Sequence, residues 1–166
     1  MRKFAIALGL TLLGTYSYLA WIGVPPKDQR PGTRLAGLAA PLPSDLSFTN
    51  DLQEVYLQTH PWYGIPFSVT TVIVHHGGHL YIPSLYDSPQ AFPGTKYWNR
   101  VVAANPEVRL LAGERIFDLT IAPVLDETEF NAVFNALGRK FPFWREQIEL
   151  DGRLPRFALL RLTART

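Results

Sequence analysis

The stretch TTVIVHHGGHLYIPS, residues 70–84, decides the fold because it has the pattern of a β-hairpin. Two runs rich in β-branched and aromatic residues, 70–76 and 79–84, flank the pair Gly77-Gly78. A two-residue glycine loop suits the primed turns that join antiparallel strands, because these turns need positive φ angles. The stretch therefore predicts two neighbouring strands joined by a tight turn.

The three histidines of this stretch raise the question of a metal site. In the predicted register, His76 and His79 share one face of the hairpin and His75 lies on the other. Zinc takes three or four protein ligands, and His60 is the only other imidazole in the chain. Since the chain also lacks cysteine, we expect no metal site and interpret the histidines as polar residues at a solvent-exposed turn.

A second hairpin is predicted further along the chain. The runs VRLLA (108–112) and RIFDLTI (115–121) flank Gly113-Glu114. If these two residues form the loop, Arg109 lies opposite Asp118, which is a favourable cross-strand pair of opposite charges. The charge pair supports this register independently of the turn.

The remaining elements complete a mainly β, α+β domain. Strands are expected at 54–59 and 157–164, and a helix at 96–105. A second helix should start at Asp126, with Glu129 three residues later as in a capping box. The order strand, hairpin, helix, hairpin, helix, strand predicts a six-stranded antiparallel barrel with two helices.

The N-terminal segment has the pattern of a membrane anchor. Residues 4–24 carry no charge and follow Arg2 and Lys3. As a helix they would be roughly 31 Å long, about the thickness of the hydrocarbon layer. We expect residues 1–24 to form a transmembrane signal anchor that ends before Pro25-Pro26. A cleaved signal peptide is the alternative interpretation.

The anchor sets the expected domain organisation and location. Residues 25–50 contain five prolines and two glycines, which is typical of an extended linker. Residues 51–166 would then form the folded domain. The basic residues flanking the anchor are nearly balanced. We expect a single-pass protein of the cell membrane, in contact with the lipid bilayer through residues 4–24, with its domain on the extracytoplasmic side.

Composition excludes several classes of function. The net charge is +2 with both signs interspersed, so there is no basic run for a nucleic-acid partner. No Ser-His-Asp or paired-carboxylate pattern is present, which argues against a hydrolase. No catalytic residue can be named from the sequence.

One combination of residues suggests an anion site. Ser84 ends a predicted strand, and Lys96 stands at the start of a predicted helix, where free N–H groups and a partial positive charge gather. Together they could hold a phosphate. In the alternative interpretation, Ser84 only ends the strand and Lys96 is solvated.

The order of these elements resembles the FMN-binding split-barrel superfamily, which includes pyridoxamine phosphate oxidases and deazaflavin-dependent nitroreductases. The resemblance covers about residues 52–163. The positions that match its recurring skeleton are Gly78, Leu80, Tyr81, Ser84, Lys96, Trp98, Asn99, Asn105, Pro106 and Val108.

The resemblance implies a split β-barrel, usually a homodimer, with FMN or a deazaflavin at the subunit interface. In such proteins the cofactor performs the hydride chemistry. The cofactor-binding residues that it implies are Thr70, Thr71, Ser84, Lys96, Trp98 and Asn99. By position, the serine and the lysine would contact phosphate, and the two threonines would border the ring. The tryptophan and the asparagine would lie near the cofactor or at the dimer interface.

One segment departs from the family pattern. Deazaflavin-binding relatives carry a Gly-Arg-x-Ser-Gly-like turn between the first two strands, whereas this chain has HPWYGIP at 60–66. FMN, a haem-type ligand or no cofactor therefore stay open. The expected function is a membrane-anchored flavin or deazaflavin-type oxidoreductase that transfers hydride to a small or lipid-soluble acceptor, a quinone or nitro compound. The alternative is a non-catalytic split-barrel module that binds a ligand or partner at the membrane surface.

Overall fold

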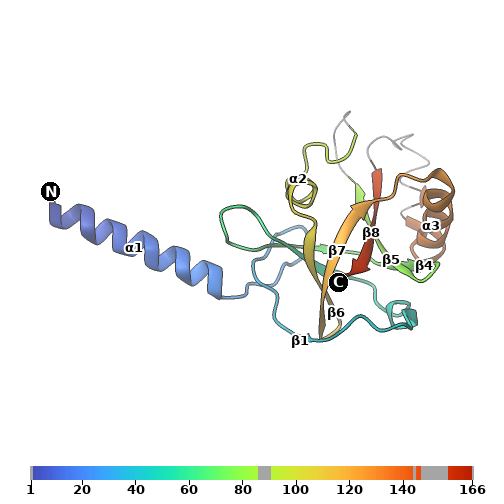
Figure 1. The fold of residues 1–166 in the computed structure, drawn as a ribbon, viewed down its shortest axis with the longest axis horizontal. Helices are drawn as coiled ribbons and strands as arrows, with labels where there is room; N and C mark the ends of the chain where they lie inside the picture. The colour runs from blue at the N-terminus through green and yellow to red at the C-terminus, as the bar shows by residue number, and fades with distance from the viewer. Residues whose placement is uncertain (1, 86–90, 144, 147–156, 166) are drawn as a thin grey trace.

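The computed structural model describes residues 2–85, 91–143, 145–146 and 157–165, and it shows a curled sheet flanked by helices (Figure 1). The elements, in chain order, are α1 (Arg2–Trp21), β1 (Leu38–Ala39), η1 (Ser47–Thr49), β2 (Val55–Thr59), β3 (Phe67–Thr71), β4 (Val74–His76), β5 (His79–Leu85), α2 (Tyr97–Ala104), β6 (Glu107–Ala112), β7 (Arg115–Pro123), α3 (Glu127–Lys140) and β8 (Phe157–Ala164).

The sheet has eight strands in the described part of the chain, rather than the six expected. Seven follow the order β3-β2-β6-β7-β8-β5-β4, and all pairs along it are antiparallel. The short β1 pairs with β7 in parallel. The mainly β, α+β class with helices outside a curled antiparallel sheet is confirmed.

The strand predicted at residues 70–76 is divided between two strands in the structure. The run 70–76 breaks at Val72 and Ile73, so that Thr70 and Thr71 end β3 and the rest forms β4. These two strands stand at opposite ends of the strand order, although only two residues separate them. The sheet therefore curls until its edges meet, and buried Ile73 lies at this closure. The sequence did not show the break because the β-branched pattern continues through it.

Both predicted hairpin turns are confirmed. The β4–β5 register pairs His76 with His79 around Gly77-Gly78, whose φ angles are 55° and 78°. In the second hairpin Arg109 pairs with Asp118, and Nε lies 2.7 Å from Oδ1. Since this ion pair is on the surface, it marks the register and contributes little to stability.

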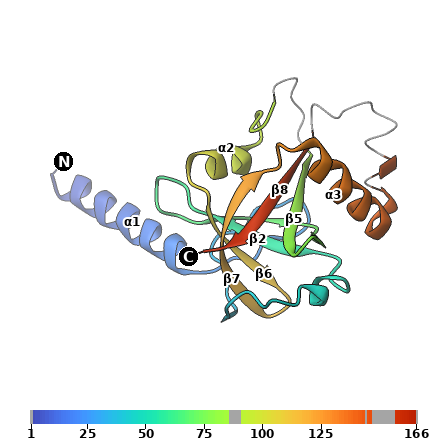
Figure 2. The ribbon, with the colours of Figure 1, turned by 45° about the vertical axis from the view of Figure 1, so that its right-hand side comes forward.

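Two apolar clusters hold the fold together. The larger fills the curled sheet with side chains such as Leu57, Leu110 and Phe117, and α2 adds Trp98 to it. The smaller lies between α3 and the outer face of the sheet and includes Leu137. Figure 2 shows α2 and α3 at separate places outside the sheet.

The two predicted helices are confirmed with slightly shorter bounds. In α3, the side chain of Asp126 accepts a 2.7 Å hydrogen bond from the backbone N–H of Glu129, as the capping pattern predicts. Helix α2 ends at Ala104, and the N–H of its capping residue Asn105 donates to the Val101 carbonyl. Pro106 follows and prevents continuation of the helix.

Helix α1 projects away from the barrel (Figures 1 and 2). No helix in the described residues has both the length and the apolar character needed to cross a bilayer. The prediction of a transmembrane helix over residues 4–24 is therefore not confirmed. Polar side chains such as Thr11, Thr15 and Ser17 lower the hydropathy of the run.

The segment 25–50 is more ordered than an extended linker. Besides forming β1 and η1, it buries Leu35 and Leu46 against the barrel. Two hydrogen bonds, of 2.9 and 3.0 Å, join the backbones of Gly32 and Ser68. This part is therefore packed against the barrel and is not the extended linker that was expected. Its apolar side chains are buried although the segment contains several prolines.

Candidate functional site

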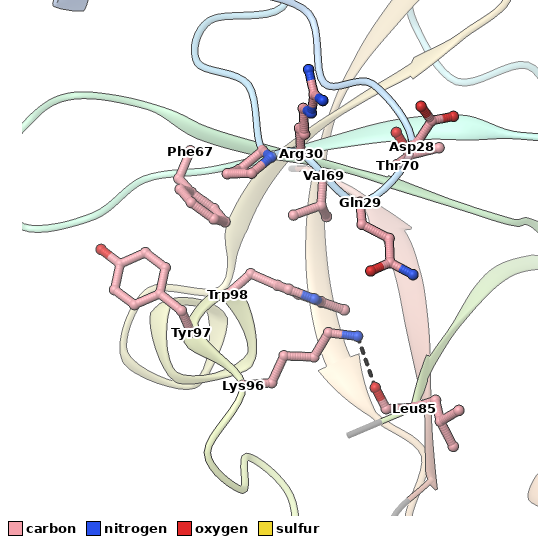
Figure 3. A pocket seen from close by; sticks show the side chains of 11 residues that line it. Asp28, Gln29, Arg30, Phe67, Val69, Thr70, Leu85, Lys96, Tyr97 and Trp98 are labelled. Carbon is pink, nitrogen blue, oxygen red and sulfur yellow. Dashed lines mark hydrogen bonds between the residues drawn. The ribbon is translucent and has the colours of Figure 1, made fainter. Parts of the chain in front are cut away.

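A cavity of about 530 Å³ opens where β3, the start of α2 and the turn at residues 28–31 meet (Figure 3). A smaller cavity of about 270 Å³ continues it and shares five of its lining residues, among them Thr70, Lys96 and Trp98. We call the two together the Lys96 groove. The residues that line it are Asp28, Gln29, Arg30, Pro31, Gln53, Glu54, Phe67, Val69, Thr70, Thr71, Val72, Pro83, Leu85, Lys96, Tyr97 and Trp98.

Lys96 is the main cation inside this groove. It occupies the N-cap position of α2, with extended backbone angles, so its side chain leaves the helix axis toward β5. Its ammonium donates a 2.8 Å hydrogen bond to the Leu85 carbonyl and lies 5.5 Å from the centre of the Trp98 ring. Burial lowers the pKa of Lys96. An ammonium has three donors, and the described residues engage only one of them.

Aromatic side chains form the apolar wall of the groove. Trp98 lies on the first turn of α2 and is almost fully buried. The rings of Phe67 and Tyr97 meet edge to face with 4.9 Å between their centres. The Tyr97 hydroxyl donates to the Tyr63 hydroxyl over 2.9 Å. Burial, and then this hydrogen bond, raise the pKa of Tyr63 to about 12.

Thr70 and Thr71 at the end of β3, which the resemblance implies to border the cofactor ring, line the groove. The Oγ1 atom of Thr70 is buried and has no hydrogen-bond partner in the described part of the chain. That of Thr71 donates a long, 3.5 Å hydrogen bond to the Pro83 carbonyl. Because buried hydroxyls are normally paired, the Thr70 hydroxyl is an available partner for a ligand.

Two expected site residues lie elsewhere. Ser84 and Asn99 are fully buried and do not line the groove. The Ser84 hydroxyl donates to Oδ1 of Asn99 over 2.8 Å, and Nδ2 of Asn99 donates to the Pro93 carbonyl over 3.1 Å. These bonds engage the polar groups of both side chains, so Ser84 fixes α2 to β5 through Asn99, which is a residue of that helix.

Sequence reasoning missed the opposite rim of the groove. Asp28, Gln29 and Arg30 come from the segment predicted to be a linker. They belong to a tight turn in which Lys27 and Arg30 exchange two backbone hydrogen bonds, and Asp28 has a φ of 54°. The Asp-Gln pair beside prolines hinted at a turn, but nothing in the sequence placed that turn beside β3.

In the first hairpin His76 and His79 are cross-strand partners, while His75 and His79 make contacts with other side chains. Nδ1 of His75 lies 3.0 Å from the hydroxyl of Thr49, and the ring of His79 contacts that of Tyr81 edge to face. Among the described residues, no group of three or more potential metal ligands lies close together. The expectation of no metal site stays a prediction.

Comparison with known proteins shows the fold. No protein-family model matches the chain, and a search of curated proteins finds no match. Among solved structures, it is similar to a Listeria innocua protein described as a candidate pyridoxamine 5′-phosphate oxidase. The two are 14% identical and superpose with a TM-score of 0.50, over 73% of this chain and 90% of that one.

Two further solved structures have the same architecture. An FAD-binding protein from Mesorhizobium loti is 14% identical and matches with a TM-score of 0.50, over 72% of this chain and 84% of its own. A chain described as a domain-swapped dimer is 17% identical, with a TM-score of 0.51 and coverages of 68% and 81%. The chain therefore has the split-barrel fold of these neighbours, as the resemblance implied. At such low identity the likeness shows the fold alone.

Proposed function

We propose that the chain is a flavin-type oxidoreductase whose cofactor binds in the Lys96 groove. One observation carries the proposal: an ammonium with free donors, a buried indole face and an unpaired threonine hydroxyl line a single groove. A phosphate and a heteroaromatic ring need this combination of a cation, an apolar wall and a hydrogen-bonding group. The resemblance to FMN-binding split barrels and the FAD-binding structural neighbour support the choice of a flavin.

In this proposal, each residue of the Lys96 groove binds a different part of the flavin. Lys96 would hold the phosphate through charge-assisted hydrogen bonds, which are stronger than neutral ones. Trp98, Phe67 and Val69 would pack against the ring, and the Thr70 hydroxyl would bond to a polar atom at its edge. A flavin bound there supplies hydride transfer. The protein supplies orientation and keeps water from the buried face of the ring.

The finer parts of the proposal concern the acceptor and the surroundings of the protein. We propose a small or lipid-soluble acceptor, a quinone or a nitro compound, because the turn at residues 28–30 is close in sequence to α1, which exposes leucines such as Leu12 and Leu13. From the uncharged run of residues 4–24 that follows Arg2 and Lys3, we also propose that the protein works at the cell membrane, with its domain on the extracytoplasmic side. The domain-swapped dimer among the structural neighbours supports a homodimer.

A non-catalytic ligand-binding module is the second candidate. It is favoured by the burial of Ser84, which leaves Lys96 as the only one of the two expected phosphate contacts that faces the groove. The turn at 60–66 also lacks the arginine of deazaflavin-binding relatives. In this candidate function the groove binds its ligand without redox chemistry.

The experiment that separates the candidates is a binding titration read by visible absorbance. The purified full chain is titrated in turn with FMN, a deazaflavin cofactor and haem. The proposal expects saturable binding of FMN or the deazaflavin. Once an added chemical reductant has reduced the bound cofactor, a quinone or a nitro compound should accept the hydride and reoxidise it. Binding of haem alone would support the second candidate, and uptake of none of the three would contradict the flavin proposal.

A further inference from the structure

A separate cavity of about 420 Å³ lies between the loop at 60–66 and the outer face of α2. Pro61, Trp62, Tyr97, Val101 and Ala104 form its apolar wall, and His60, Arg100 and Asn105 add polar groups. Its size is within the range of small-molecule sites, which are mostly apolar with a few polar groups. We propose that this cavity binds an apolar carboxylate, with the hydrocarbon chain against Trp62 and α2 and the carboxylate on Arg100.

The apolar wall contains a side chain that is costly to leave in water. Trp62 is 96% exposed, although tryptophan is usually buried for most of its surface. A turn closed by the 3.0 Å hydrogen bond from Gly64 N–H to the Pro61 carbonyl holds its backbone. Across the cavity, Val101 and Ala104 follow one another on α2 at a spacing of three residues. A hydrocarbon chain between these walls would cover apolar surface on both sides.

The charges around the cavity favour an anion. The guanidinium of Arg100 has no hydrogen-bond or ion-pair partner among the described residues, and no carboxylate lines the cavity. The two acidic groups that act on the pKa of His60 are already paired: Glu107 with Arg165 at 2.6 Å, and Asp118 with Arg109 at 2.7 Å. Arg100 is therefore an exposed cation at the cavity with no partner among the described residues, and a carboxylate matches its planar set of donors.

His60 also favours the binding of an anion with a single charge. Its burial, and secondarily the charge of Arg109, lower the pKa of its imidazole. The ring is therefore mostly uncharged at pH 7 and can donate one hydrogen bond without adding a second charge. An ordinary monocarboxylate then meets one cation and one neutral donor, which fits its single charge.

This site is distinct from the flavin proposal, although Tyr97 borders both cavities. The test uses dodecanoate as the probe, with dodecanol and butyrate as comparisons, and measures binding to the full chain by calorimetry below micelle-forming concentrations. We expect dodecanoate to bind at least tenfold more tightly than either. Dodecanol lacks the carboxylate and butyrate lacks the long chain, so each removes one half of the proposed recognition.

Three variants place the binding in this cavity. Ala104→Trp fills it and should abolish dodecanoate binding, whereas Ala103→Trp, on a different cavity beside the same helix, should leave it unchanged. Arg100→Gln should weaken dodecanoate about tenfold or more, as expected for a charge-assisted contact, and leave dodecanol unaffected. Thermal unfolding confirms that each variant folds.

The inference is overturned if dodecanoate binds Ala104→Trp as tightly as the parent, because binding is then elsewhere, for instance on the apolar helix α1. It is also overturned if dodecanol binds the parent as tightly as dodecanoate. FMN titration of Ala104→Trp runs beside these measurements. Its outcome depends on the Lys96 groove alone and so tests the flavin proposal separately.

Discussion

The hydroxyl of Ser84 donates a 2.8 Å hydrogen bond to Oδ1 of Asn99, and both side chains are fully buried. This bond joins the end of β5 to the first turn of α2, the turn that also carries Trp98. The resemblance implied a phosphate contact for Ser84 and a place near the cofactor or at the dimer interface for Asn99. In the structure, the bond between them fixes α2 to β5. They act on the Lys96 groove through the placement of α2.

The first prediction concerns this support. Ser84→Ala leaves the buried amide oxygen of Asn99 without its donor, so the free energy of unfolding should fall by about 1–3 kcal/mol. Urea unfolding followed by circular dichroism measures the change. A variant of unchanged stability with weaker FMN binding would show that Ser84 contacts the cofactor directly, contrary to the structure.

The second prediction concerns the cation of the groove. Lys96→Ala should weaken FMN binding by several-fold or more, because a charge-assisted contact to the phosphate is lost. Riboflavin, which lacks the phosphate, should bind parent and variant alike. Fluorescence titration of both ligands makes the comparison. If the variant loses FMN and riboflavin equally, Lys96 has a general structural role and no specific role toward the phosphate.

The third prediction concerns the closure of the barrel. The ammonium of Lys140, at the end of α3, donates to the carbonyls of Thr49 and Ile73, and Ile73 lies in the bend that joins β3 to β4. Lys140→Met should lower the free energy of unfolding by roughly 1–3 kcal/mol, since two buried carbonyls lose a charged donor. Its exposed neighbour Arg139 provides the control, because Arg139→Met should change stability by less than about 0.5 kcal/mol. Equal effects of the two substitutions would contradict this role.

The fourth prediction concerns stability at high pH. The Tyr81 hydroxyl donates to Glu129 over 2.8 Å, and burial, then this bond, raise its pKa from 10.0 to about 12. The folded state keeps this proton longer than the unfolded state, so the contribution is fully present below pH 10 and is lost as pH rises through about 12. The raised pKa of Tyr63 acts with the same sign, and the lowered pKa of Lys96 acts with the opposite sign.

Denaturant unfolding at a series of pH values tests this linkage. In Tyr81→Phe the decline of the free energy of unfolding between pH 10 and 12 should become shallower. Combining it with Tyr63→Phe should flatten the decline further. A parallel decline in the parent and both variants would show that other groups control stability in this range.

The fifth prediction concerns the binding of helix α1 to membranes. Residues such as Leu12 and Leu13 of α1 are exposed, so we expect the full chain to bind phospholipid vesicles through this helix. Leu12→Glu with Leu13→Glu should reduce the fraction that floats with vesicles by at least tenfold. Leu125→Glu, at another exposed leucine near α3, should not change it. Flotation that is equal in all three proteins would show that α1 does not mediate the contact.

Local sequence patterns predicted the parts of the fold that depend on nearest neighbours. The patterns concerned are Gly77-Gly78 and Gly113-Glu114 at the two hairpin turns, the opposite charges of Arg109 and Asp118, and the cap at Asp126. Each acts over a few residues. Their geometry is therefore nearly independent of the rest of the chain. The same local patterns did not reveal the break at Val72-Ile73, because both strands that meet there have the same residue preferences.

The candidate site likewise has parts that the sequence predicted and parts that only the tertiary structure placed. The sequence by itself determined that Lys96 stands at the N-terminus of α2, that Trp98 lies on this helix and that Thr70 and Thr71 lie in a strand. Only the tertiary structure placed Asp28 and its turn across the groove and buried Ser84 beneath α2. The physical reason is that burial and long-range approach depend on how the curled sheet closes, which no local pattern encodes.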